Sequence, residues 1–172
     1  IRTMGWFTSL YPIMLSSQRG IGESIKSTKE ILRNIPRKGL GYGLLFGYKN
    51  LPRVVFNYLG RFDGSAGDLW TITGEKAGKS VAASNRDDTL ISFNGSIING
   101  VLNFIVSSKL GADSTRKLAD CFKQYLEKII AHTSTLKRSY LTASDIANII
   151  SQANLDRIQS EAEIEGVYLA NS

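Results

Sequence analysis

The fold class is decided by the stretch Pro52-Arg-Val-Val-Phe-Asn-Tyr-Leu-Gly-Arg-Phe-Asp63, which has the composition of a β-strand. Its β-branched and aromatic residues favour a pleated surface. Because side chains alternate between the faces of a strand, Asn57 is expected on the face opposite Phe56 and Tyr58. Asn57 is a carboxamide on a face that we expect to be buried. Unless its donors and its acceptor find partners, burying it costs roughly 1–3 kcal/mol.

The rest of the chain alternates between strand and helix patterns. In order, we expect a strand at 6–15, a helix at 21–35, a short helix at 44–48, a central strand at 53–61, a strand at 69–73, a loop at 74–88, strands at 90–98 and 101–107, a helix at 114–132, a capped helix at 146–151 and a turn at 155–158. Asn99-Gly100 is a strong hairpin signal, and a second Asn-Gly at 94–95 is compatible with a bulge. This order predicts an α/β fold with a mixed, mainly antiparallel sheet packed with helices.

Composition narrows the function classes. The 172 residues suit one domain or one lobe of a larger one, and no apolar run approaches the roughly 20 residues of a membrane span. A net charge of +6 comes without a nucleic-acid-binding motif, so we expect neither a nucleic acid nor a membrane as partner. The single cysteine, Cys121, excludes an internal disulfide, favours a cytoplasmic setting and is expected in the core. The single histidine, His132, is expected to be exposed or to cap a helix.

General chemical motifs are absent. One histidine without suitable partners gives no Ser-His-Asp triad, and no metal-ligand spacing occurs. The glycine cluster at 39–43 lacks the lysine of a phosphate-binding loop, so a tight turn is expected there. The residues by themselves therefore leave the function open.

Three motifs resemble those of epimerization domains in nonribosomal peptide synthetases. Arg2-Thr-Met-Gly-Trp-Phe-Thr-Ser-Leu-Tyr-Pro12 is similar to R-T-V-G-W-F-T-x-x-Y-P, with Met4 in place of valine. Pro36-Arg-Lys-Gly-Leu-Gly-Tyr-Gly43 matches P-x-x-G-x-G-Y-G, and Phe56-Asn-Tyr-Leu-Gly-Arg61 matches F-N-Y-L-G-Q/R. The related condensation domains would show G-x-F-V-N-T and H-Q-D-x-P-F-E, which are absent here. The resemblance covers essentially the whole chain.

The resemblance implies a chloramphenicol-acetyltransferase-like fold of two lobes, with the active site in a channel between them. Residues 1–160 look like the C-terminal lobe, and 161–172 look like a linker toward a following condensation domain. The histidine and glutamate motifs of the family belong to the preceding part of the domain. The isolated chain is therefore expected to be inactive.

The activity that the resemblance implies is L-to-D conversion of an aminoacyl or peptidyl thioester by α-proton abstraction and return, in antibiotic or other secondary-metabolite biosynthesis. No cofactor is expected to bind directly, because the substrate hangs on the phosphopantetheine arm of an upstream carrier domain. Asn57 and Tyr58 are the expected supporting catalytic residues, and Trp6, Thr8 and Tyr42 are expected to line the substrate channel. Two alternatives remain open: a condensation-type lobe that forms peptide bonds, and a non-catalytic lobe that binds a carrier.

Overall fold

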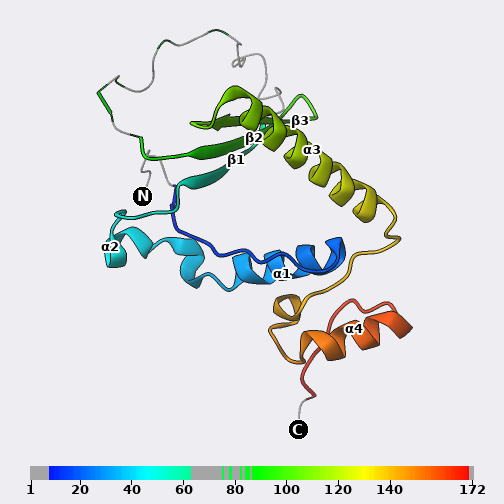
Figure 1. Cartoon of the computed structure of the whole chain (residues 1–172). Helices are drawn as coiled ribbons and strands as arrows, with labels where there is room; N and C mark the ends of the chain where they lie inside the picture. The colour runs from blue at the N-terminus through cyan, green and yellow to red at the C-terminus, as the bar shows by residue number, and fades with distance from the viewer. Residues whose placement is uncertain are drawn as a thin grey trace, which may run out of the picture. The chain divides into compact units, whose positions relative to one another are not determined.

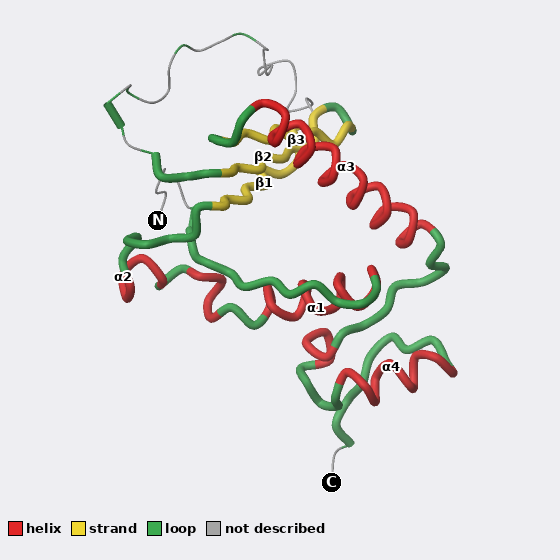
Figure 2. The backbone as a smooth tube through the Cα atoms, in the orientation of Figure 1, coloured by secondary structure: helices red, strands yellow, loops and turns green. Residues whose placement is uncertain are grey.

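The computed structural model describes residues 8–62, 75, 78, 82, 84, 85 and 87–170 (Figures 1 and 2). The chain divides into two units. The first comprises Ile1–Leu51 and Gln124–Ser172, and the second comprises Pro52–Lys123. The predicted boundary between a lobe and a linker at residue 160 stays a prediction.

The second unit is built on a mixed three-stranded sheet of order β1-β2-β3. Its strands are β1 (Val54–Phe62), β2 (Ile91–Ile98) and β3 (Val101–Ser108). β1 runs parallel to β2, and β2 runs antiparallel to β3. The predicted α/β class with a mixed sheet is therefore confirmed.

The hairpin between β2 and β3 turns at Asn99-Gly100, as the sequence predicts. Asn99 has φ +51° and Gly100 has φ +76°, so both central residues adopt the left-handed conformation that this pair tolerates. Helix α3 (Ala112–Ser134) packs on one face of the sheet through Phe122. The Phe122 ring lies 4.8 Å from that of Phe93 and 4.9 Å from that of Phe104, centroid to centroid.

One expectation about this sheet is wrong. Asn94 and Gly95 pair regularly with β3, so they form no bulge; the irregularity lies in β1, between Tyr58 and Arg61. Position 95 requires glycine, because the Phe104 ring occupies the space that a Cβ atom would take. Among the described strands β1 lies at the edge of the sheet, and its predicted central place stays a prediction. The strand expected at 69–73 falls outside the residues that are described.

The first unit holds α1 (Ile21–Arg33), the 3-10 turn η1 (Pro36–Gly39) and α2 (Tyr42–Phe46). It also holds the 3-10 turn η3 (Ala143–Ile146) and α4 (Gln152–Glu161). The first two predicted helices are confirmed, and the last turn extends into a ten-residue helix.

The C-terminal prediction is only partly correct. The capping box of Thr142 and Asp145 forms as expected. The helix that it begins ends at Ile146, because Ala147 and Asn148 have φ values of +53° and +58°. A helix at 146–151 is therefore wrong.

The strand expected at 6–15 is also wrong where the structure describes it, since residues 8–15 have no regular structure. Pro12 cannot donate a ladder hydrogen bond. Tertiary contacts hold the segment instead: the Ser9 hydroxyl donates to the Lys38 carbonyl at 3.0 Å, and the Tyr11 ring lies against the backbone of Gly39.

Few of the described side chains are fully enclosed. Those below 5 % exposure are Thr142, Ile146, Leu155 and Gln159, all in the C-terminal segment. Cys121 is exposed, so the expectation of a core cysteine is wrong. The reason lies in α3, where Phe122 points at the sheet and the preceding residue is rotated about 100° away.

Candidate functional site

The carboxamide of Asn57 has a partner on the neighbouring strand. Asn57 lies directly opposite Asn94 in the register of β1 and β2, and its Nδ2 donates to Asn94 Oδ1 at 3.3 Å. In the part of the chain that the structure describes, this is its one side-chain hydrogen bond. Asn57 is half-buried, and no buried side-chain nitrogen or oxygen among the described residues lacks a partner. Its carbonyl oxygen, which has no described partner, is therefore not buried, and the bond to Asn94 uses one of the two N–H groups of Nδ2.

The face of the sheet around Asn57 carries neutral polar side chains at its centre and apolar ones around them. We call this the amide face; the registers of the three strands place on it Val55, Asn57, Phe62, Ser92, Asn94, Ser96, Ile98, Val101, Asn103, Ile105 and Ser107. The opposite face carries the aromatic rings that meet α3. The amide face offers neutral donors and acceptors, which suits recognition of an amide or a thioester without a formal charge.

Tyr58 does not share the amide face. It pairs with Gly95 in the regular part of the register, and the bulge at Gly60 (φ +92°) comes after it. Asn57 and Tyr58 therefore point to opposite faces of β1. A ligand lying on one face would contact only one of the two.

Two of the three predicted channel residues, Thr8 and Tyr42, are described, and both belong to the first unit. Thr8 is exposed in an irregular segment, and Tyr42 begins α2 with its ring 5.2 Å from that of Phe46. Trp6 lies outside the described residues. Since Asn57 and Tyr58 belong to the second unit, the structure does not define one site from these five residues.

Two of the three motifs fold against each other within the first unit. Gly39 of the glycine motif is buried, has φ +76°, and has no room for a Cβ beside the Tyr11 ring of the first motif. Gly43 is occupied in the same way by the ring of Tyr48. These glycines therefore give the close approach of two chain segments, rather than a phosphate-binding loop.

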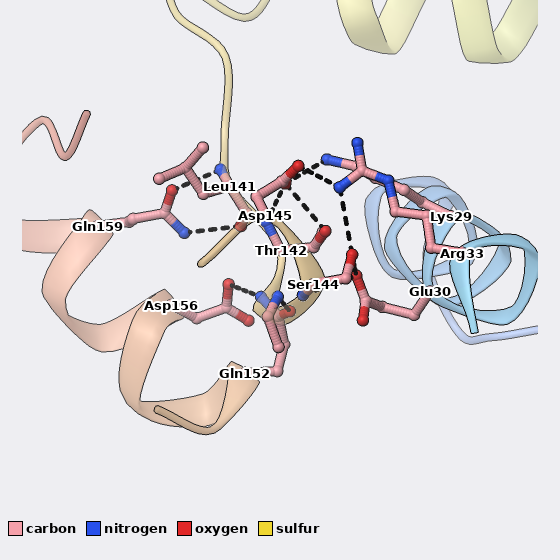
Figure 3. Close-up of polar contacts among 11 residues, drawn as sticks. Lys29, Glu30, Arg33, Leu141, Thr142, Ser144, Asp145, Gln152, Asp156 and Gln159 are labelled. Carbon is pink, nitrogen blue, oxygen red and sulfur yellow. Dashed lines mark hydrogen bonds and ion pairs between the residues drawn. The ribbon is translucent and has the colours of Figure 1, made fainter. Parts of the chain in front are cut away.

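Among the described residues, a large polar cluster joins α1 to the C-terminal segment (Figure 3). We call it the Asp145 network; it comprises Lys29, Glu30, Arg33, Thr142, Ser144 and Asp145. The Asp145 carboxylate pairs with Lys29 and Arg33, and it accepts from the Thr142 N–H at 2.7 Å. Glu30 accepts from the Ser144 hydroxyl at 2.6 Å. Every member has a partner within the cluster, so the network stabilises the contact between α1 and the C-terminal segment.

Electrostatics agree with this role. Partial burial acts to raise the pKa of Asp145, but the hydrogen bonds from Lys29, Arg33 and Thr142 outweigh it and hold the pKa well below the ordinary range. Burial also acts to raise the pKa of Glu30. The hydrogen bonds from Ser144 and Thr142 and the charge of Arg33 outweigh it, so the pKa of Glu30 is lowered. Both carboxyl groups are therefore charged at neutral pH.

Helix α4 adds amide hydrogen bonds and one ion pair to the same region. The buried Gln159 side chain accepts from the Leu141 N–H at 2.7 Å and donates to the Leu141 carbonyl at 3.1 Å. Asp156 accepts from Lys26 of α1 at 2.9 Å. The capping box can be predicted from the sequence, because its residues are three positions apart. The Lys26–Asp156 contact cannot, because it joins residues more than a hundred positions apart. The contacts of Gln159 cannot either, because they depend on the burial of its side-chain amide.

Two open grooves border α1 in the first unit. The larger, about 720 Å³, is lined by α1 and by residues 132–142, with Ile25, Leu136 and Tyr140 among its apolar residues. The smaller, about 660 Å³, is lined by residues 17–32 with Tyr125 and Ile129. His132, half-buried in the last turn of α3, lines the larger groove without an acid–base partner in a described hydrogen bond.

The described residues contain no group of three or more His, Cys, Asp or Glu side chains able to hold a metal ion. Within the same residues, none of the helices combines the length and the apolar character that crossing a membrane requires.

Curated relatives match most of the chain. N-(5-amino-5-carboxypentanoyl)-L-cysteinyl-D-valine synthase of Amycolatopsis lactamdurans is 36% identical over 144 residues, which is 80% of this chain and 4% of that protein. Bacitracin synthase 3 of Bacillus licheniformis is 33% identical over 196 residues, covering 99% of this chain and 3% of that protein. Tyrocidine synthase 1 of Brevibacillus parabrevis is 33% identical and covers 85% and 16%. The chain thus spans a small part of each relative.

A solved structure is also similar. The epimerization domain from the third module of tyrocidine synthetase B aligns with a TM-score of 0.65 and 32% identity, covering 76% of this chain and 33% of that one. The chain is an epimerization- or condensation-type lobe of the peptide synthetase family. No protein-family model matches the lobe.

One residue of the candidate site was not predicted from the sequence. Asn94, the partner of Asn57, stands 37 positions away along the chain and outside the three motifs. Its Asn-Gly context was compatible with a bulge, although alternation along a strand would have placed it on the face of Ser92 and Ser96. Only the register between β1 and β2 brings the two amides together.

Proposed function

We propose that the lobe is part of an epimerization domain, which converts an L-aminoacyl or peptidyl thioester on a carrier protein to the D form. Three observations support this: the three motifs, the relatives among peptide synthetases, and the likeness to a solved epimerization domain at 32% identity. The observation that carries most weight is local. The F-N-Y-L-G-R motif lies on β1 with Asn57 half-buried on a polar face and part of its amide unused.

The proposed chemistry is α-proton removal and return. The thioester acidifies the α-hydrogen, and negative charge develops on its oxygen as the proton leaves. A neutral N–H fixed in advance stabilises such an oxygen. The second N–H of Asn57 supplies this donor, and the hydrogen bond to Asn94 fixes the plane of the carboxamide.

Proton transfer itself needs acid–base groups within reach of both faces of the α-carbon. We assign those groups to the histidine and glutamate motifs that the family resemblance places in the preceding part of the domain. The lobe would then supply orientation and charge stabilisation, and alone it would be inactive. Tyr58 would support the reaction only from the opposite face of β1.

The same proposal covers the partners and the setting. The substrate would arrive on the phosphopantetheine arm of an upstream carrier domain, pass residues of a channel that includes Trp6, Thr8 and Tyr42, and leave toward a downstream condensation domain. The N-terminal lobe of the same domain would complete the active site. An exposed free thiol at Cys121 fits the cytoplasmic setting that we propose.

The test uses the intact domain with a carrier loaded with a single L-amino acid or peptide. After the thioester is cleaved, chiral chromatography measures the L and D fractions. We expect the same mixture whether the carrier is loaded with the L or with the D form. Retained configuration together with peptide-bond formation would favour the condensation-type alternative, and no reaction at all would favour the carrier-binding alternative.

A further inference from the structure

Asn94 carries a second carboxamide beside that of Asn57, and its amide nitrogen has no partner among the described residues. Asn94 Oδ1 accepts from Asn57 Nδ2 at 3.3 Å, whereas Asn94 Nδ2 donates to no described atom. Asn94 is half-buried, and no buried side-chain nitrogen or oxygen in the described part of the chain lacks a partner. The Asn94 Nδ2 group is therefore not buried, and it holds two N–H donors that no described residue uses.

The hydrogen bond gives the amide pair a direction. An amide that accepts a hydrogen bond at its oxygen is polarised, and its N–H groups become stronger donors. Within the pair, Asn57 donates and Asn94 accepts, so the strengthened donor is Nδ2 of Asn94. The pair therefore has its better donor at Asn94 and its unused acceptor at Asn57.

The backbone holds Asn94 in a regular part of the sheet. β2 is the middle strand of the described sheet, and Asn94 pairs in register with β1 on one side and with β3 on the other. The next residue, Gly95, is buried, and the Phe104 ring occupies the space of its Cβ. By contrast, the register of β1 becomes irregular just beyond Asn57. Asn94 is thus a donor fixed in advance, which is the kind that stabilises developing charge without reorganisation.

The chemistry of the amide face selects the atom that Asn94 contacts. All the residues that the registers place on this face are uncharged. A permanently charged ligand would find no counter-charge there, whereas an oxygen that gains negative charge only during a reaction is stabilised by fixed neutral donors. The carbonyl oxygen of a thioester is such an atom, because it is neutral in the substrate and negative in the enolate.

We propose that Asn94 is a further catalytic residue, whose Nδ2 donates a hydrogen bond to the thioester carbonyl oxygen beside the second N–H of Asn57. When a base takes the α-proton, the C–H electron pair forms a carbon–carbon double bond and the carbonyl π electrons move to the oxygen. The two amides stabilise that oxygen until the α-carbon takes up a proton again. The inference rests on the proposed function, because it assigns a role within the same reaction.

The test is a double-mutant cycle in the intact domain, with Asn57→Ala, Asn94→Ala and the two combined. Deuterium incorporation at the α-carbon of a carrier-bound L substrate in D₂O measures proton removal. A residue that acted only by positioning Asn57 would have no effect once Asn57 is alanine. We expect Asn94→Ala to slow exchange by roughly 100-fold alone and by at least about 10-fold in the Asn57→Ala background. The loss should fall on kcat, with KM little changed, because the charge develops in the transition state.

Asn154→Ala, at an exposed position of α4, is the matched control and should leave the exchange rate unchanged. Absence of a further loss in the Asn57→Ala background would overturn the inference. If Asn94→Ala lowers stability in urea unfolding, Asn94→Asp gives a second measurement, since it keeps an acceptor for Asn57 and removes the donors. Exchange by Asn94→Asp at the rate of the unmodified domain would also overturn the inference.

The two levels of the proposal fail in different ways. A folded, unmodified domain that incorporates no deuterium would refute the proposed function. Incorporation that depends on Asn57 but not on Asn94 would refute this inference alone.

Discussion

The Asp145 network and the Asn57–Asn94 pair are the two main polar arrangements of the described chain, and they differ in how fully they are satisfied. Asp145 receives hydrogen bonds or ion pairs from Lys29, Arg33 and Thr142 (Figure 3). Asn57 has a single side-chain hydrogen bond, 3.3 Å long, within the described residues. The Asp145 network lies outside the three motifs, whereas Asn57 lies inside one of them.

This difference suggests a structural role for the Asp145 network and a functional role for Asn57. A charged network whose members all have partners stabilises the contact of α1 with the C-terminal segment. An amide pair with an unused donor and an unused acceptor contributes less to stability, but it can contact a ligand. Substitutions in the Asp145 network should therefore change stability, and substitutions at Asn57 should change the reaction rate.

The largest effect is expected from Asn57→Ala in the intact domain. Loss of a fixed N–H donor to the developing oxyanion should lower the epimerization rate by about 100-fold. Chiral analysis of the released product measures the rate. Asn103→Ala is the matched control, since Asn103 lies on the same face and donates to the Val101 carbonyl. Equal epimerization rates for both variants would show that Asn57 contributes only to packing and not to the reaction.

Asp145→Ala should act on stability instead. It leaves Lys29 and Arg33 without their carboxylate and removes the cap of the Thr142 N–H, at a cost of about 2 kcal/mol in the free energy of unfolding. Urea unfolding of the intact domain measures the change, and Glu163→Ala in the exposed tail is the control. A rate defect without a stability defect would contradict the assignment.

The pH dependence of unfolding sharpens the same point. The folded state holds the pKa of Asp145 below its ordinary value, so it binds fewer protons than the unfolded state. The stabilisation is complete well above the unfolded pKa of about 4, and it is lost as the pH falls below about 5. The unmodified domain should therefore lose more stability than Asp145→Ala between pH 7 and pH 3. Parallel losses would show that Asp145 is not involved.

The smallest effect is expected from Tyr58→Phe. Because Tyr58 lies on the face of β1 opposite Asn57, we expect a change in the epimerization rate of less than about 3-fold. A defect as large as that of Asn57→Ala would mean that the strand turns both side chains to one substrate in the complete domain.

The sequence predicted elements that depend on local chemistry. Asn99-Gly100 forms the hairpin because both residues accept positive φ, and Thr142 with Asp145 forms the capping box because the contacts are three residues apart. The amphipathic pattern of residues 21–33 likewise gives a helix.

Elements that depend on long-range contacts were not predictable in this way. The strand expected at 6–15 does not form over residues 8–15, where Tyr11 packs on Gly39 instead, and the partner of Asn57 follows from the register of two strands separated by a long connection. The expectation of a core Cys121 is wrong because only some of the apolar residues of α3 contact the sheet, and Cys121 is not one of them. In each case the deciding neighbour is distant along the chain.

The central claim is tested most directly by solvent deuterium exchange. The intact domain is incubated in D₂O with a carrier loaded with the L substrate, and mass spectrometry measures deuterium at the α-carbon. We predict incorporation in step with inversion, and loss of both in Asn57→Ala. Inversion without deuterium, or no deuterium at all in a folded domain that binds its carrier, would contradict the account.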